Sequence, residues 1–413
     1  MKYIFKRESI MAMTPISEPS LPPAAKTAAP WRPGHAVWQL GFRPFYLLAA
    51  VFAAISVPLW LASYFGLLQG ALQVGLGWHM HEMVFGFAVA VVVGFLLTAG
   101  RNWTGLDTPR GAHLMALVAL WLAGRVLLYA APGVVAALVD WLFLPLAAWP
   151  LLLVLHRSGN HRNLFLVLLL ALLALANGLY HAASFGWLRL SPALPVQAAI
   201  LIIVVIESVI GARVIPMFTR NGAPGSTPVS HPKRALVAVA LMALAGISWL
   251  AGLPGVVTAP LSLCAAGVSL ANLLAWQPQH TLRVPLLWIL HLSYAWIGLG
   301  FVLLALASVH IVPASAAFHA LTVGSMAGLI IGMITRTTLG HTGRPLKAGR
   351  AEACMYWLVQ LGAVARLLAA LGPAPLLLPA LVVAGALWSL AFVLYAVTYA
   401  PYLCRPRVDG KEG

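Results

Sequence analysis

The sequence predicts an all-α polytopic membrane protein with about twelve transmembrane helices, and an internal repeat suggests three four-helix units. Hydrophobic residues make up 62% of the 413 residues and charged residues only 8%. A soluble domain carries roughly 25% charged residues, so this chain cannot cover a water-facing surface. Long apolar runs, and loops with basic residues that alternate with loops almost without them, support the same fold class.

A membrane-spanning helix needs about 20 predominantly apolar residues. Short turns rich in Pro and Gly, such as 131–133, 253–255 and 372–375, separate the apolar runs. The predicted spans are 41–65, 78–99, 111–131, 134–155, 162–186, 194–217, 235–253, 257–276, 285–307, 311–335, 353–371 and 376–401.

The predicted spans divide the chain into an N-terminal tail, a transmembrane domain and a C-terminal tail. Residues 1–40 are rich in Pro, Ala and Ser and lack an apolar run, so we interpret them as a disordered cytoplasmic tail. Met11 and Met13 are alternative starts within it. Residues 41–402 form the predicted twelve-helix domain, and residues 403–413 form a cytoplasmic C-terminal tail.

Basic residues follow the even-numbered spans, and the intervening loops carry almost none except Arg189. The positive-inside rule therefore predicts a multi-pass membrane protein with both termini in the cytoplasm. The net charge of +16 lies at helix ends rather than on one face, which argues against nucleic acid as a partner. The partner that composition does indicate is the lipid bilayer.

An internal repeat relates the second span to the tenth. The residues that recur at equal offsets are His81, Gly86, Gly94, Thr104 and Gly105 in the first copy and His319, Gly324, Gly332, Thr342 and Gly343 in the second. The two spans are eight apart, so they run in the same direction. Glycine could also recur because small residues let membrane helices pack closely.

Ionisable side chains within the bilayer are costly, by about 2.5–3.5 kcal/mol each on insertion scales, and are candidates for function. On the predicted topology, one set of them falls in the outer half of the membrane, with Glu207 nearer the middle of the sixth span. The set comprises His79, His81, His181, His319, Arg125, Asp140 and Arg366, with Asn177 one turn before His181.

His79 and His81 cannot both bind one metal ion from a regular helix, because positions two apart point about 200° away from each other. They therefore favour two cofactor sites. Glu82 is three residues after His79 and shares its face, which suits a carboxylate that orients an imidazole.

Four histidines at one depth favour a cofactor or metal site, with His79, His81, His181 and His319 as ligands. Neutral imidazole is the commonest metal ligand and suits haem iron and copper. Arg125 and Arg366 could pair with haem propionates. The alternative is that each histidine only bonds a neighbouring helix and that Arg125 forms a salt bridge with Asp140.

Several long motifs resemble the NnrS family across nearly the whole chain after residue 35. They lie at 41–45, 78–87, 211–219, 319–324 and 333–345. The resemblance implies a haem- and copper-containing inner-membrane protein that takes part in the response to nitric oxide and in resistance to nitrosative stress. Met80 stands where the family usually has a small residue between the two histidines. The resemblance supplies no defined reaction.

Two other functions stay open at the level of sequence. An oxygen- or nitric-oxide-reductase type of enzyme would suit buried histidines, but the chain has no adjacent His-His pair and no tyrosine-bearing metal motif. A secondary transporter would suit buried charges and repeats, although transporter repeats are often inverted and this one is direct. An absorbance spectrum would separate the haem-containing classes from the transporter.

Overall fold

The computed structural model describes residues 29–68 and 74–411 and is helical throughout, with no strand in those ranges. Twelve helices in this part of the chain are long and apolar enough to cross a membrane, so the predicted fold class is confirmed. Each lies where an apolar run predicted it, with ends that differ by a few residues.

The spans are continuous helices except that the second and tenth each combine three segments. The second consists of α2 (Leu76–His81), η2 (Glu82–Ala88) and α3 (Val89–Thr104), and the tenth of α11 (Ala314–His319), η5 (Ala320–Ala327) and α12 (Gly328–His341). The others are α1 (Phe42–Tyr64), α4 (Ala112–Ala130), α5 (Val134–Arg157), α6 (Leu164–Ser184), α7 (Ala193–Gly222), α8 (Pro232–Leu250), α9 (Gly255–Ala275), α10 (Pro285–Ser308), α13 (Arg350–Leu371) and α14 (Leu377–Leu403). Short 3₁₀ turns lie at η1 (Ala36–Trp38), η3 (His161–Asn163), η4 (Pro278–Thr281) and η6 (Ala374–Leu376).

Several of these helices begin or end at residues that are favoured at helix termini. Gly105 closes α3 in a left-handed conformation with φ of 69°, which glycine adopts without steric cost. Pro232 and Pro285 occupy the first positions of α8 and α10, where the missing N–H costs no hydrogen bond.

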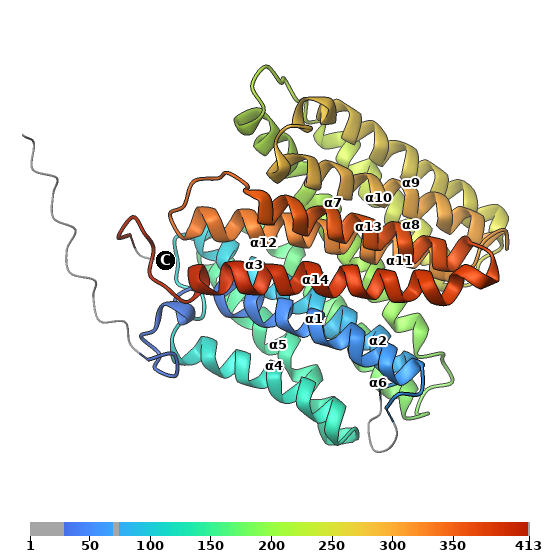
Figure 1. Cartoon of the computed structure of the whole chain (residues 1–413), viewed down its shortest axis with the longest axis horizontal. Helices are drawn as coiled ribbons and strands as arrows, with labels where there is room; N and C mark the ends of the chain where they lie inside the picture. Colours follow the sequence, from blue (N-terminus) through green and yellow to red (C-terminus); the bar gives the residue numbers. More distant parts are fainter. Residues whose placement is uncertain (1–28, 69–73, 412–413) are drawn as a thin grey trace, which may run out of the picture.

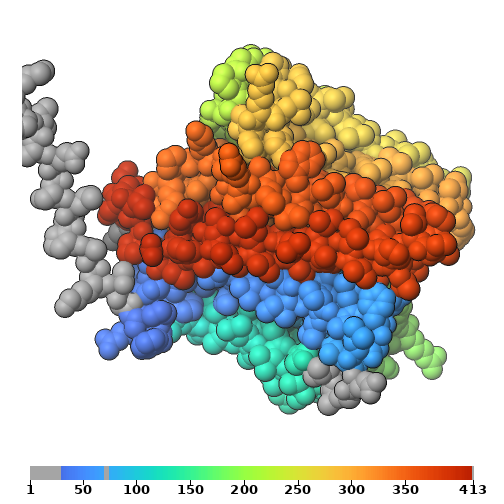
Figure 2. All heavy atoms as spheres, viewed as in Figure 1, coloured from blue at the N-terminus to red at the C-terminus, as the bar shows by residue number. Residues whose placement is uncertain are grey.

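Most consecutive helices pack against each other, and α14 returns to pack on α1, as the blue and red ribbons in Figure 1 show. Figure 2 shows α13 and α14 forming a continuous band between α1 and the helices of the middle of the chain. The second and tenth spans lie deepest, with 83% and 78% of their most apolar windows buried, against 28% for Pro232–Leu250. The repeated spans are therefore central, while α8 exposes large apolar side chains such as Leu236 and Leu244 to the surroundings.

The internal repeat has a counterpart in the backbone. The π-helical segments η2 and η5 begin directly after His81 and His319, at matching positions of the repeat. Such segments are rare and are often found at functional sites. Gly86 and Gly324 lie inside them, and a Cβ at Gly86 would come within 2.8 Å of the Arg125 guanidinium. Glycine is therefore needed at both positions, because the neighbouring side chains leave no space for a Cβ atom.

Gly324→Ala is expected to lower stability by about 1–3 kcal/mol, the usual cost of overpacking. The new Cβ would overlap the indole of Trp296, whose Nε1 donates to the Gln360 side chain at 2.7 Å and so holds the ring in place. Thermal unfolding of the detergent-purified protein measures the effect. Gly267→Ala on α9 is the matched control, because no atom lies within 4 Å of its added methyl group. Equal melting temperatures for the two variants would contradict this packing.

Candidate cofactor sites

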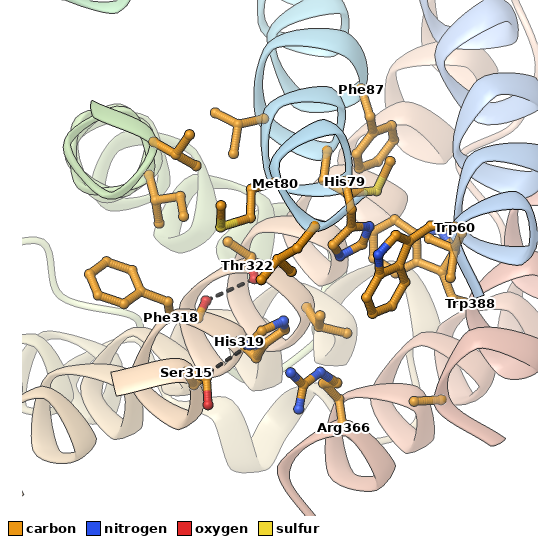
Figure 3. Close-up of a pocket in the computed structure, with 18 of the residues that line it drawn as sticks. Trp60, His79, Met80, Phe87, Ser315, Phe318, His319, Thr322, Arg366 and Trp388 are labelled. Atoms are coloured by element: carbon orange, nitrogen blue, oxygen red, sulfur yellow. Dashed lines mark hydrogen bonds between the residues drawn. The ribbon is translucent and has the colours of Figure 1, made fainter. Parts of the chain in front are cut away.

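A cavity of about 400 Å³ opens between α1, α2, α7, α11, α13 and α14, and we call it the outer cavity. The ionisable residues that line it are His79, His319 and Arg366. Trp60, Phe87 and Trp388 supply aromatic walls. Figure 3 shows His79, His319 and Arg366 pointing into this space from three different helices. A mostly apolar cavity with a few convergent polar groups is typical of a small-molecule or cofactor site.

His79 is held by stacking and has an unused ring nitrogen. Its imidazole lies on the indole of Trp60, with ring centroids 4.0 Å apart and an interplanar angle of 17°. Its Nδ1 atom is buried and has no hydrogen-bond partner. A buried polar atom without a partner is costly and uncommon, so this nitrogen is consistent with a ligand that the protein chain does not supply.

His319 is oriented by the backbone of its own helix. Its Nδ1 lies 2.6 Å from the carbonyl oxygen of Ser315, one turn earlier. A carbonyl oxygen can only accept, so Nδ1 carries the proton and Nε2 keeps its lone pair. That tautomer is the one in which an imidazole can bind a metal through Nε2.

Arg366 reaches the outer cavity from α13 without an acidic partner. No carboxylate lines this cavity, and in the described part of the chain none forms a salt bridge with Arg366. The guanidinium therefore leaves a positive charge facing an apolar space, where an anionic group of a ligand would be stabilised.

A second group of polar residues, which we call the buried cluster, lies between η2 and helices α2, α4, α5 and α6. Its members are His81, Glu82, Arg125, Asp140, Asn177 and His181, all of them buried. Arg125 joins its two carboxylates: Nη1 donates to both oxygens of Glu82 at 2.7 Å, and Nη2 pairs with Oδ1 of Asp140. A charge at this depth needs such partners to be tolerated.

The histidines complete the buried cluster. Nδ1 of His81 donates to Glu82 at 2.9 Å, and its Nε2 lies 2.9 Å from Oδ1 of Asn177 and 3.2 Å from Oδ2 of Asp140. His181 donates from Nε2 to the same oxygen of Asp140 at 2.9 Å, and the Asn177 amide donates to it at 2.8 Å. Both imidazoles thus direct Nε2 at Asp140.

One ligand atom from each of His81, Asp140 and His181 falls within 4.8 Å of the other two, a spacing that could hold a metal ion. Two imidazole nitrogens and a carboxylate oxygen suit several transition metals, including copper. Glu82 accepts from Nδ1 of His81, which leaves Nε2 as the ligand atom once its proton leaves.

The structure separates the predicted residues into two sites. His79, His319 and Arg366 line the outer cavity, whereas His81, His181 and Arg125 belong to the buried cluster. The opposite directions of His79 and His81 follow from the helical spacing. His81 and His319 hold equivalent places in the repeat, yet they face different sites.

Three finer expectations concern the partners of these residues. The salt bridge between Arg125 and Asp140, which sequence reasoning left as the alternative to a propionate contact, is present. Glu82 bonds His81 rather than His79, and Asn177 also bonds His81. Sequence reasoning did not include Asp140 among the ligands, although its position in the outer half of the fourth span was a signal that it could be one. It missed Trp60 entirely, since stacking across helices leaves no sequence pattern.

Fold and sites together define a polytopic helical membrane protein with an apolar cavity lined by two histidines and an arginine, beside a buried cluster of histidines, carboxylates and one arginine. The model of the NnrS protein family matches residues 36–407, nearly the whole chain, so the protein belongs to the NnrS family. Comparison with curated proteins found no match.

Proposed function

We propose that this protein binds haem and copper in the bacterial inner membrane and takes part in the response to nitric oxide and in resistance to nitrosative stress. The observation that carries the proposal is the outer cavity, where two imidazoles and a guanidinium with no carboxylate partner among the described residues meet in an apolar space. Membership of the NnrS family is consistent with it.

The outer cavity suits haem by the chemistry of its lining. His79 or His319 would hold the iron, since imidazole is a common axial ligand, and Arg366 would pair with a propionate. Trp60, Phe87 and Trp388 offer the flat apolar walls that a porphyrin ring requires. When bound, haem iron supplies a coordination position for a diatomic gas such as nitric oxide.

The buried cluster suits a single metal ion, and copper agrees with its two imidazoles. The cluster also explains how the chain tolerates the site when no ion is bound. Arg125 neutralises part of the charge on Glu82 and Asp140, and both His81 nitrogens face oxygen acceptors. Each imidazole would bind an ion through a nitrogen lone pair, so an Nε2 atom that donates within the cluster would have to give up its proton on binding.

Spectroscopy of the purified, untreated protein tests the proposal directly. We expect the absorbance bands of haem, a change in these bands when nitric oxide is added, and copper detectable by elemental analysis. A preparation that is folded by size exclusion yet contains neither haem nor copper after expression with both supplied would contradict the proposed function.

In the proposed orientation across the membrane, both termini lie in the cytoplasm. Basic residues in the connections after α3, α5, α9 and α12, and at the facing ends of α7 and α8, support this orientation, because such residues are retained on the cytoplasmic side. A reporter fused after Gly413 is expected to be active as a cytoplasmic reporter and inactive as an exported phosphatase. Strong phosphatase activity at that position would show that the proposed topology is wrong and that both sites lie on the cytoplasmic side.

A further inference from the structure

A second large cavity, of about 720 Å³, lies at the opposite end of the helix bundle from the outer cavity, and we call it the inner cavity. It is bounded by α3, α7, α12 and the connection between α5 and α6. Three arginines from three different elements line it: Arg162 from η3, Arg213 from α7 and Arg336 from α12. Neither the haem nor the copper proposal involves any of them.

Two of these arginines have contacts that hold the guanidinium group in place without neutralising its charge. Arg213 donates from Nη1 to the Asn163 side chain at 2.9 Å and lies within electrostatic range of Arg162. Arg336 lies over the ring of Phe218, with its guanidinium carbon 3.8 Å from the ring centroid. A neutral amide and an aromatic face orient an arginine but supply no negative charge.

The carboxylates of the described residues all lie elsewhere. Glu82 and Asp140 belong to the buried cluster. Glu207 lines a smaller neighbouring cavity, not the inner cavity, and accepts a hydrogen bond from the Ser325 hydroxyl at 3.1 Å. The others pair away from the inner cavity: Asp107 with Arg101 and Arg110, Glu352 with Tyr399, and Asp409 with Arg407. Three arginines around one space thus repel one another without a counter-charge from the described chain, and an anion would relieve that repulsion.

The deeper wall of the inner cavity is apolar. Phe95, Val214 and Met333 line it and also line a smaller cavity of about 90 Å³ farther into the bundle. The space therefore offers arginines at one side and apolar surface at the other. A ligand with an anionic head and an apolar body matches both.

We propose that the inner cavity binds a phosphate-bearing amphiphile, with the phosphate between Arg162, Arg213 and Arg336 and the apolar body along Phe95 and Met333. Guanidinium groups bind phosphate oxygens through paired, charge-assisted hydrogen bonds. Basic pockets between transmembrane helices are a known form of site for anionic lipid head groups. The phosphate could come from a bilayer phospholipid or from a water-soluble compound, and the experiment separates these sources.

The test uses the full-length protein purified in a neutral detergent. Thermal unfolding is measured with added phosphatidylglycerol, with phosphatidylcholine, and with inorganic phosphate alone, and bound phospholipid is extracted and quantified. Wild type should retain phospholipid and gain stability from phosphatidylglycerol more than from phosphatidylcholine. Stabilisation by inorganic phosphate with no preference between the lipids would assign the same site to a soluble phosphate compound.

The variants compare arginines inside and outside the inner cavity. The double variant Arg213→Gln, Arg336→Gln should bind phosphatidylglycerol at least about tenfold more weakly, given that one hydrogen bond to a charged group contributes about 1.5–3 kcal/mol. Arg220→Gln is the matched control, because Arg220 lies two turns after Arg213 on α7, outside the cavity lining, and donates to the Pro228 carbonyl oxygen. Equal affinity of the double variant, the control and wild type for every phosphate ligand would overturn the proposal.

Discussion

Replacing Arg125 by Leu is expected to destabilise the folded protein by about 3–5 kcal/mol, the usual cost of removing one partner from a buried ion pair. Arg125 is the only arginine that contacts the buried cluster within the described residues, and it binds Glu82 and Asp140 together. Its loss leaves two carboxylates in a buried environment, with only the histidines and Asn177 to compensate them. Melting temperature and the yield of monodisperse protein measure the loss.

Arg366→Leu is the variant to compare with Arg125→Leu, because it also removes an arginine from a membrane span, here the eleventh. Arg366 lines the outer cavity and pairs with no described carboxylate, so its replacement should change stability by no more than about 1 kcal/mol. If it holds a propionate, haem content should fall more than protein yield does. Adding Glu82→Gln to Arg125→Leu should restore part of the lost stability, because one orphaned charge is removed. Similar melting temperatures for the two single arginine variants would contradict the distinction between the two sites.

The positions of the spans were predictable because each apolar run is long enough to require a membrane helix. The repeat could also be found from spacing, since Gly86 and Gly324 recur at equal distances from His81 and His319. What the spacing did not reveal is why glycine is needed there. Gly86 makes room for Arg125 and Gly324 for Trp296, and these contacts come from residues far away in the sequence.

The grouping of the histidines was only partly predictable. The helical period separates His79 from His81, but it says nothing about which other helix each one meets. His79 meets His319 across the outer cavity, while His81 meets Asp140 and His181. The expected contact of Glu82 with His79 did not form, because the Glu82 carboxylate is held by Arg125 and His81 while His79 stacks on Trp60. Helix packing therefore decides the composition of both sites.

Single replacements of the four histidines by Ala should divide into two classes. His79→Ala and His319→Ala are expected to reduce haem content, because both imidazoles line the outer cavity, with little effect on copper. His81→Ala and His181→Ala should reduce copper content, because both direct Nε2 at Asp140, and should leave more of the haem. Losses of about tenfold or more are expected, since even residues that only orient a ligand change metal affinity by about 10–100-fold.

The measurement is haem absorbance and copper content per folded monomer after size exclusion, which separates loss of a cofactor from loss of the fold. His113→Ala is the control, since His113 is exposed at the start of α4, three turns before Arg125, and belongs to neither site. His81→Gln is a second variant at that position, because its amide can keep a hydrogen bond within the buried cluster while removing the imidazole. Full haem and full copper in every variant would show that these histidines are structural. Loss of haem from the His81 and His181 variants, with copper retained, would reverse the assignment of the two sites.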